Sequence, residues 1–323
     1  MFASSEHWPQ VLVYHANGRV ARGYVDELAR LGYPAKRLAA ASSEEEARTK
    51  IGLADVLFAW RFPPALLAQA TRLRWVQSMG AGVDDLAQNP HVPPDCLVTR
   101  VVDQFGGPIA EYVFAHLLYL YKDLARSVSQ QARGVWEPWR PDMLGGRTIG
   151  VAGVGSIGRE IALRARAFSM RVCGLSRTKT DRQALLDEHF GPDQWPAFAS
   201  RCDVLVLTLP LTPQTRHAVG APVLDAMRRD AILVNVGRGE LVDERALLSA
   251  LDRGHLRAAV LDVFAEEPLP AASPLWTVPR AHITPHVAGP SQISQVCAFF
   301  ADNLVRDRRG LPLVGVVDGA RGY

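Results

Sequence analysis

The sequence predicts an α/β protein built from two doubly wound parallel sheets. Apolar, strand-like runs alternate with helical patterns through almost all of the 323 residues, an order typical of parallel strands joined by crossover helices. A glycine-rich turn in residues 148–158 (TIGVAGVGSIG) lies near the middle of the chain. The strands before this turn therefore belong to a separate domain, and the chain is long enough for two domains with cores of their own.

The expected elements follow one another in a regular order. Four strand-like runs precede the glycine turn, at residues 10–14, 54–60, 74–79 and 97–101. A long helix comes next, because apolar residues from Ile109 to Tyr121 recur at a spacing of three to four. Six further runs lie at residues 148–154, 171–176, 203–209, 231–236, 258–263 and 282–285. A final helix is expected at residues 292–306.

The mid-chain position of the turn indicates that one domain is inserted into the other. We assign residues 1–103 and 288–323 to the outer domain and residues 104–287 to the inserted one. Hinges are expected where the chain crosses between them, and a cleft between two domains is a common place for a ligand.

A polar, Trp-bearing segment at residues 125–146 is too long for an ordinary connection. Its tryptophans, Trp136 and Trp139, argue against disorder. We interpret the segment as an arm that packs on a neighbouring surface. That surface belongs either to a second subunit or to the same chain, and a homodimer is the assembly that we expect.

Composition excludes several classes of function. The 36 Lys and Arg residues nearly balance the 33 Asp and Glu residues, so we expect neither a nucleic-acid nor a membrane partner. No apolar run reaches the ~18 residues of a membrane span, and we expect a cytoplasmic protein. The four cysteines are scattered without a C-x-x-C pair, which predicts buried thiols rather than disulfides or a metal site.

The glycine turn predicts a dinucleotide site. Gly153, Gly155 and Gly158 have the G-x-G-x-x-G spacing, and they lie between a predicted strand and a predicted helix. The helix that begins near Ser156 and Ile157 directs its first amides at a phosphate. The inserted domain is therefore predicted to be a Rossmann cofactor domain.

The end of the second strand of this domain indicates which dinucleotide binds. An NAD site normally has Asp or Glu there, to hold the ribose 2′-hydroxyl. This chain has Ser176, followed by Arg177 and Lys179, with Arg182 close by. Because a guanidinium binds a phosphate that a carboxylate repels, we predict NADPH in preference to NADH. The alternative is a solvated basic turn.

Three polar side chains follow predicted strands of the inserted domain. Arg238 lies in NVGRGELVD, Glu267 in LDVFAEEPLP and His286 in HITPHVAG. An arginine holds a carboxylate, and a histidine beside a carboxylate suits proton transfer near neutral pH. Taken alone, Glu267 and His286 could be a solvated loop residue and a histidine satisfied by backbone. At adjacent strand ends they favour an acid–base pair.

The chain resembles the D-2-hydroxyacid dehydrogenases over essentially its whole length. The matching segments include SMGAGVDDL, GPIAEYVFAHLL, TIGVAGVGSIG, ILVNVGRGELVDERALLSAL and ITPHVAG. Within that family it is most similar to NADPH-dependent glyoxylate/hydroxypyruvate reductases, through LSRTKT, SPLW and the C-terminal VDGARGY. The resemblance implies that the outer, substrate domain is flavodoxin-like.

The resemblance also implies roles for individual residues. Arg238 would bind the substrate carboxylate and carbonyl, and His286 would be the acid–base residue paired with Glu267. Spacing from Asp262 favours Glu267 over its neighbour Glu266. The implied substrate-binding residues are Trp60, Met79, Gly80, Ala81, Gly82 and Trp276. The implied further cofactor contacts are Leu209, Pro210, Thr215, Val236, Gly237 and Asp262, the last near the nicotinamide carboxamide.

The predicted reaction is NADPH-dependent reduction of a small 2-oxo acid, such as glyoxylate or hydroxypyruvate, to the D-2-hydroxy acid. Three alternatives stay open: another 2-hydroxy acid, a non-carbon substrate such as phosphite or formate, and a dinucleotide sensor without turnover. One departure from the family pattern is Gly289-Pro290, where many relatives have a small hydroxyl residue.

Overall fold

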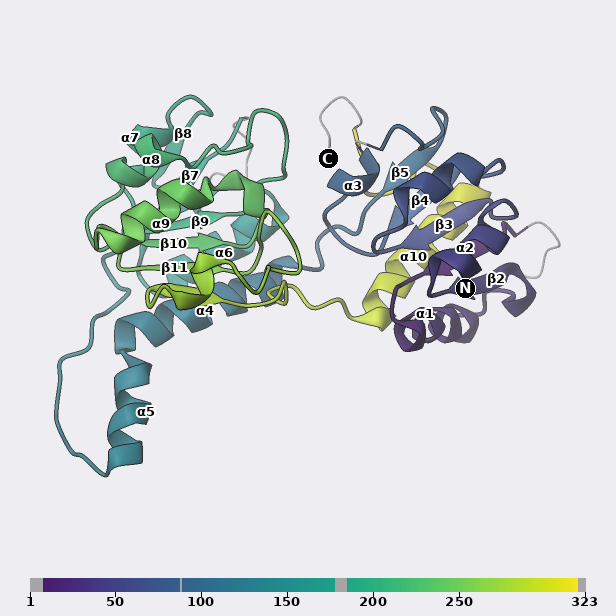
Figure 1. Cartoon of the computed structure of the whole chain (residues 1–323). Helices are drawn as coiled ribbons and strands as arrows, with labels where there is room; N and C mark the ends of the chain where they lie inside the picture. Colours follow the sequence, from purple (N-terminus) through teal and green to yellow (C-terminus); the bar gives the residue numbers. More distant parts are fainter. Residues whose placement is uncertain (1–7, 88, 178–184, 319–323) are drawn as a thin grey trace. The chain divides into compact units, whose positions relative to one another are not determined.

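A computed structural model describes residues 8–87, 89–177 and 185–318 (Figure 1). The chain divides into two compact units. The terminal unit comprises Met1–Gln104 and Ser291–Tyr323, and the central unit comprises Phe105–Pro290. From the sequence, we expected the chain to pass between the two domains after residue 103 and after residue 287. The roles assigned to the two domains, substrate binding and cofactor binding, stay predictions.

The terminal unit contains a five-stranded parallel sheet in the order β2-β1-β3-β4-β5, the order of flavodoxin-like sheets. Its strands are β1 (Val11–Tyr14), β2 (Leu38–Ala41), β3 (Val56–Ala59), β4 (Trp75–Ser78) and β5 (Leu97–Thr99). All residues of β1, β3 and β4 are buried, as expected for strands covered on both faces. The edge strand β2 was not predicted, because its sequence LAAA lacks the β-branched and aromatic residues that signal a strand.

Helices and short 3-10 turns surround this sheet. They are α1 (Gly18–Arg30), η1 (Ala35–Arg37), α2 (Glu44–Ile51), η2 (Pro64–Gln69), α3 (Asp84–Ala87) and α10 (Ile293–Arg308). Asn17 and Ser43 begin α1 and α2 by accepting hydrogen bonds from first-turn amides. The final helix, α10, starts one residue after its predicted position and packs on α1, where Ile293 lies against Gly23.

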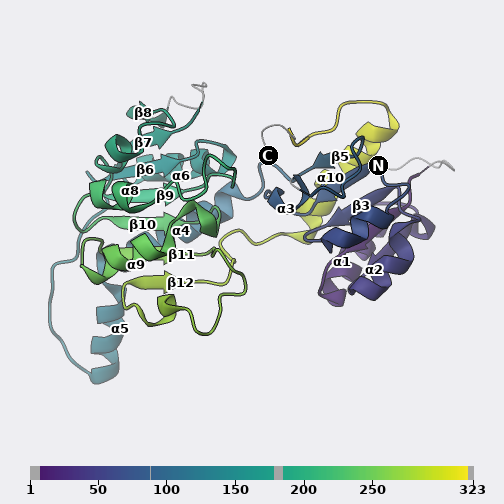
Figure 2. The same ribbon diagram turned by 45° about the horizontal axis from the view of Figure 1, so that its top comes forward.

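The central unit contains a seven-stranded parallel sheet in the order β12-β11-β10-β9-β6-β7-β8 (Figure 2). Its strands are β6 (Thr148–Ala152), β7 (Arg171–Leu175), β8 (Glu188–Phe190), β9 (Val204–Leu207), β10 (Ile232–Asn235), β11 (Ala258–Leu261) and β12 (Ala281–Ile283). The order reverses between β6 and β9, which is where doubly wound sheets bind ligands beyond the carboxyl ends of their strands. The predicted α/β fold with two parallel sheets is confirmed. The short, polar edge strand β8 gave no signal in the sequence.

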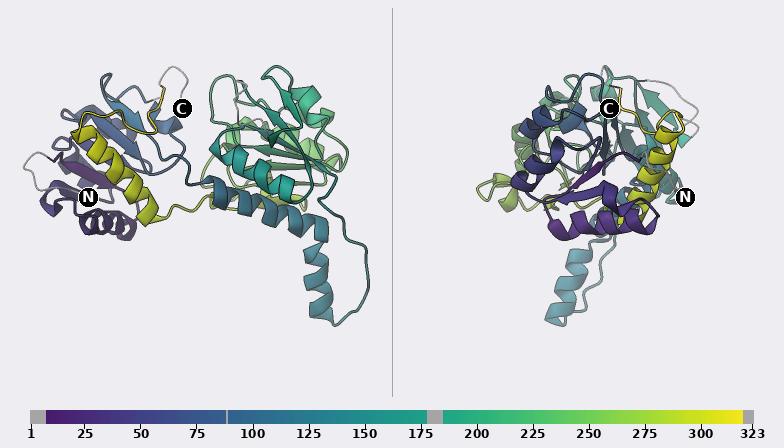
Figure 3. Two further views of the ribbon diagram at one scale, coloured as in Figure 1. Left: turned by 180° about the vertical axis from the view of Figure 1, so that it is seen from behind. Right: turned by 90° about the vertical axis from the view of Figure 1, so that its right-hand side faces the viewer.

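Helices cover both faces of this sheet. They are α4 (Gly106–Lys122), α5 (Leu124–Arg133), α6 (Ser156–Ala167), α7 (Trp195–Ala199), α8 (Ala221–Ala226) and α9 (Glu244–Asp252), with η4 (Gly239–Leu241) and η5 (Pro274–Thr277). The pair α4 and α6 lies on one face, and α7, α8 and α9 lie on the other (Figures 1 and 3). No helix among the described residues is both long and apolar enough to cross a membrane.

The predicted arm is partly helical. Its first part, to Arg133, belongs to α5, which stands away from the sheet of the central unit (Figures 1 and 3). The sequence missed this helix because its residues are mostly polar. The segment returns to the unit at Asp142, whose amide donates to the carbonyl of Tyr121 and whose carboxylate pairs with Arg257 at 2.8 Å. Trp136, beyond the end of α5, is 95% exposed.

Candidate active site

The glycine turn has the backbone geometry that a phosphate contact requires. Gly153 has a φ of +100°, and its carbonyl accepts a hydrogen bond from the Thr208 hydroxyl at 2.7 Å. A Cβ on Gly158 would lie 2.1 Å from the Gly153 carbonyl oxygen, so only glycine lets the helix pack this closely. The sequence did not single out Thr208, because this residue follows β9 and lies 55 positions after Gly153.

The space next to Gly155 in the same turn is open. A Cβ on Gly155 would meet no heavy atom within 4 Å. Among the described residues, no side chain caps α6, which begins at Ser156. The first amides of α6, including that of Ile157, therefore suit an anionic group such as a pyrophosphate.

The end of β7 places Ser176 beside a histidine. The Ser176 hydroxyl lies 3.0 Å from Nε2 of His189 on β8, and its amide donates to the Phe190 carbonyl. Arg177 follows and is exposed. Lys179 lies outside the described residues. The sequence did not single out His189, because β8 itself was not predicted.

Arg238 lies in a turn braced by a buried amide. Asn235 is 1% exposed; it donates to the Arg238 carbonyl at 2.8 Å and accepts from the Gly237 amide at 3.1 Å. The Arg238 guanidinium donates to the Gly237 carbonyl at 2.7 Å. A Cβ on Gly239 would lie 1.9 Å from the Phe264 carbonyl carbon. This turn therefore lies directly against the loop that follows β11.

Predicted cofactor contacts lie in the loops that follow β9 and β10. Val236 is buried and donates its amide to Leu207. The Leu209 carbonyl lies 2.9 Å from the position of a Cβ on Gly237. The Thr215 hydroxyl donates to the Pro210 carbonyl at 2.7 Å and so holds the loop after β9 closed.

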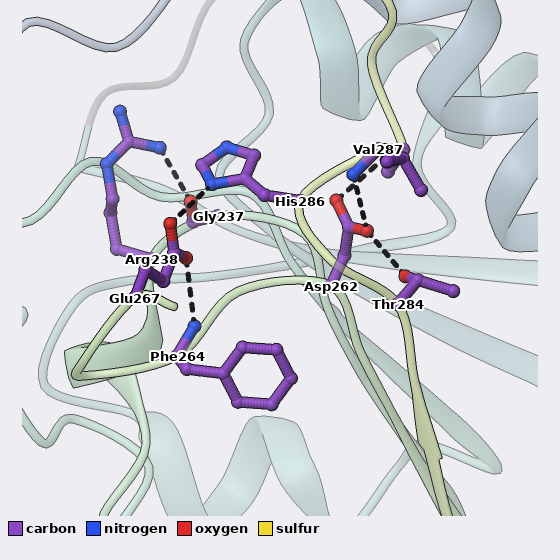
Figure 4. A network of polar contacts seen from close by, with 9 residues as sticks. Gly237, Arg238, Asp262, Phe264, Glu267, Thr284, His286 and Val287 are labelled. Atoms are coloured by element: carbon purple, nitrogen blue, oxygen red, sulfur yellow. Dashed lines mark hydrogen bonds and ion pairs between the residues drawn. The ribbon is translucent and has the colours of Figure 1, made fainter. Parts of the chain in front are cut away.

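Glu267 and His286 form a pair across two loops. His286 Nδ1 lies 2.9 Å from Glu267 Oε2, and the other oxygen, Oε1, accepts the Phe264 amide at 3.1 Å. Glu267, rather than the exposed Glu266, makes this contact. Figure 4 shows Arg238, Glu267 and His286 as neighbours on the loops that follow β10, β11 and β12.

Asp262 holds the loop that contains His286. This carboxylate is 2% exposed and accepts hydrogen bonds from the amides of Val287 and Ala288, each at 2.9 Å, and from the Thr284 hydroxyl. The main-chain carbonyl of Asp262 accepts the His286 amide at 2.9 Å. Each carboxylate oxygen thus has a partner within the loop (Figure 4).

The terminal unit brings together Trp60 and Gly80. A Cβ on Gly80 would lie 2.3 Å from the Trp60 indole, so only glycine permits this contact. The Gly80 amide donates to Ser78 Oγ at 3.1 Å, and Ser78 Oγ donates to the Gly82 carbonyl at 3.3 Å. The Gly80 amide thus has an internal partner that the sequence did not reveal.

The other predicted pocket residues differ widely in exposure. The Met79 side chain is only 1% exposed and belongs to the core of the terminal unit. The Ala81 carbonyl accepts a long hydrogen bond from Arg100, at 3.4 Å. Trp276 lies in the central unit, is 54% exposed and donates its indole N–H to Pro270 at 3.0 Å.

Comparison with known proteins identifies the family of this chain. Residues 114–288 match the family described as D-isomer specific 2-hydroxyacid dehydrogenase, NAD binding domain. Glyoxylate/hydroxypyruvate reductase A of Yersinia enterocolitica is 32% identical over 293 residues, which cover 89% of this chain and 93% of that protein. A glycine turn after the first strand of a doubly wound parallel sheet is typical of a dinucleotide-binding domain. This chain belongs to the D-isomer specific 2-hydroxyacid dehydrogenase family.

Solved structures of the same family are similar over almost the full length. One from Aeromonas salmonicida has 38% identity and a TM-score of 0.86, covering 96% of this chain and 98% of that one. The NADPH-dependent glyoxylate/hydroxypyruvate reductase of Sinorhizobium meliloti, solved with NADP and sulfate, has 28% identity and a TM-score of 0.87. It covers 98% of this chain, and all of that chain is matched.

Proposed function

We propose that this enzyme reduces small 2-oxo acids, glyoxylate and hydroxypyruvate among them, to D-2-hydroxy acids with NADPH. The observation that carries the proposal is the His286–Glu267 pair beside Arg238 (Figure 4). Carbonyl reduction needs a proton donor for the oxygen and a cation for the substrate carboxylate. The names of similar proteins, which include glyoxylate/hydroxypyruvate reductases, support the choice of substrates.

Each of the three side chains has one task in this mechanism. Glu267 accepts the Nδ1–H of His286, which leaves Nε2 as the nitrogen that exchanges a proton with the substrate. Arg238 binds the substrate carboxylate and polarises the neighbouring carbonyl. NADPH, when bound, supplies the hydride. The Gly153–Gly158 turn fits its pyrophosphate, since Gly155 leaves the approach to the backbone open.

The remaining predicted substrate contacts are residues of the terminal unit, with Trp276 from the central unit. The amides of Gly80, Ala81 and Gly82 as carboxylate ligands, and Trp60, Met79 and Trp276 as pocket residues, stay predictions. A panel of 2-oxo acids of increasing size, assayed with the wild-type enzyme, tests the compact pocket that these residues imply.

Substitution of the acid–base pair tests the proposed reaction. His286→Gln is expected to lower kcat by on the order of 10²–10⁴, because it removes the proton donor. Glu267→Gln is also expected to lower kcat, because an amide no longer holds the imidazole in the tautomer that leaves Nε2 free for proton exchange.

Glu266→Gln is the matched control, because it changes an exposed neighbour that does not make the histidine contact. The Kd of NADPH, measured by fluorescence titration, should be unchanged in all three variants. Near-wild-type turnover of His286→Gln with glyoxylate and hydroxypyruvate would contradict the mechanism.

The preference for NADPH is the second part of the proposal. Ser176 and Arg177 lie at the end of β7, where a carboxylate would favour NADH. Arg177→Ala should lower kcat/KM for NADPH by about 10- to 100-fold, the value of a charge-assisted hydrogen bond, with little change for NADH. Arg171→Ala removes an exposed cation from the other end of β7 and should not change the ratio. An unchanged ratio of kcat/KM for NADPH to kcat/KM for NADH in Arg177→Ala would contradict the predicted preference for NADPH.

We also propose that the arm packs on a second copy of the chain. Exposed apolar residues gather on it: Val128 is 66%, Met143 68% and Trp136 95% exposed. Trp136→Ser should shift the mass measured by light scattering from dimer towards monomer. Leu53→Ser, an equally simple change at a 63% exposed residue of the terminal unit, should not. A wild-type monomer would leave packing on the same chain as the alternative. The cytoplasmic location stays a prediction.

A further inference from the structure

We propose that Tyr112 and Thr284 are positioning residues, which act through Asp262 to fix His286 in its working orientation. The proposal rests on the acid–base role of His286 proposed above. A continuous series of hydrogen bonds carries it. The Tyr112 hydroxyl lies 2.7 Å from Thr284 Oγ1, and Thr284 Oγ1 donates to Asp262 Oδ1.

The direction of this series follows from the number of protons available. The single hydroxyl proton of Thr284 is used on the Asp262 carboxylate, so Thr284 must accept the proton of Tyr112. Burial raises the pKa of Tyr112 to about 12, and the phenol therefore keeps its proton throughout the physiological range. Both hydroxyl dipoles consequently point towards the same buried carboxylate, where each bond strengthens the next.

Asp262 transmits this orientation to the backbone of the histidine loop. Its carbonyl accepts the amide of His286, and its carboxylate accepts the amides of Val287 and Ala288. His286 itself has a φ of +54°, a left-handed conformation that side-chain-bearing residues adopt only when their surroundings hold it. Fixing three consecutive amides is the means by which the loop keeps this conformation.

The helix α4 is the platform to which the loop is fastened. Tyr112 holds the start of the loop at Thr284, and Ile109, one helical turn earlier, packs against Gly289 at its end, 3.1 Å from the position of a Cβ there. On the same helix His116 packs against Tyr112, with the two ring centroids 4.3 Å apart. His116 Nδ1 contacts the Tyr112 carbonyl, so it does not interrupt the series.

Conservative variants remove single hydroxyl groups from the series. Thr284→Val removes one of the two donors to the buried Oδ1 of Asp262 and should lower kcat by about 10- to 100-fold. Tyr112→Phe removes a neutral hydrogen bond and should lower kcat by about 5-fold. The double variant should be no worse than Thr284→Val alone, because both changes interrupt the same series. Thr284→Ser keeps the hydroxyl and should retain most of the activity.

Two further readouts separate positioning from a general loss of structure. The Kd of NADPH and the unfolding temperature of Tyr112→Phe should match those of the wild type. In the protein without cofactor or substrate, the imidazole ¹H–¹⁵N signals of His286, assigned by their loss in His286→Gln, should shift or broaden in both hydroxyl variants. Tyr119→Phe, which removes a hydroxyl from α4 outside the series, is the matched control and should leave these signals unchanged.

The outcomes distinguish this proposal from the one on which it rests. If His286→Gln loses activity while Tyr112→Phe and Thr284→Val keep wild-type kcat and wild-type imidazole signals, the positioning role is overturned and the acid–base role survives. If His286→Gln keeps its activity, both fail. Additive losses in the double variant would also overturn the series, because independent sites add their effects.

Discussion

The two units of this enzyme are built alike, yet different chemical groups lie at the ends of their strands. Both are parallel sheets whose strand order reverses next to the first strand of the unit. After β3 and β4 of the terminal unit, the loops present an indole and a run of glycine backbone, at Trp60 and Gly80–Gly82. After β10, β11 and β12 of the central unit, they present Arg238, Glu267 and His286 (Figure 4).

The buried polar groups of the units differ in the same way. In the terminal unit they are neutral and lie within the core. Trp75 donates to Thr99 at 2.7 Å and Thr99 to Gln77 at 2.8 Å, while Asn303 of α10 donates to the Val314 carbonyl at 2.9 Å. In the central unit Asp262 lies just beyond the carboxyl end of β11, where loop amides donate hydrogen bonds to it.

Neutral polar groups and carboxylates can be buried in different parts of a protein. Neutral amides and hydroxyls can be buried among one another, whereas a carboxylate needs several N–H or O–H donors. Loops at strand ends supply such donors because their backbone amides are not used by the sheet. The charged groups of the mechanism that we propose therefore belong to the central unit, and three sets of substitutions test that division.

The largest effect is expected from the central unit's arginine. Arg238→Ala should lower kcat/KM for glyoxylate by on the order of 10²–10³, as for other preorganised groups that stabilise charge at the reacting carbonyl. The matched change in the terminal unit is Ser78→Ala, which removes only an internal brace of the Gly80–Gly82 loop and should cost several-fold at most. Steady-state kinetics on both variants measure this, and equal losses would break the comparison.

A glycine pair within the central unit gives the next largest effect. Gly239→Ala places a Cβ 1.9 Å from backbone of the neighbouring loop and should lower the free energy of unfolding by about 3 kcal/mol, at the upper end for overpacking. Gly155→Ala places a Cβ in open space and should change it by less than about 0.5 kcal/mol, while weakening NADPH binding. Urea unfolding and NADPH titration measure the two effects. A destabilised Gly155→Ala would contradict the open approach that we describe.

The smallest effect concerns the neutral network of the terminal unit. Asn303→Leu leaves the amide and carbonyl of Val314 without their buried partner and should lower the free energy of unfolding by about 1–3 kcal/mol. The Kd of NADPH should stay unchanged, because the proposed cofactor site lies in the central unit. A weaker NADPH complex would show that the units are less independent than the comparison assumes.

The sequence predicted most of the sheet strands because a buried parallel strand is a continuous apolar run, as in VLVY and VLVL. It missed β2 and β8, since LAAA and EHF lie at sheet edges and have no such run. It also missed α5, whose polar sequence does not distinguish a helix from a loop. The glycine turn was visible because the glycines themselves are required there.

The chemical groups of this enzyme and their order along the chain follow from the amino-acid sequence, because strand patterns and glycine turns depend on neighbouring residues. Which of these groups lie in contact depends on the tertiary structure. The tertiary structure braces Arg238 with Asn235 and connects Tyr112 to Thr284 across 172 positions. Such contacts depend on how strands and helices pack, and that geometry brings together residues whose spacing in the sequence gives no sign of it.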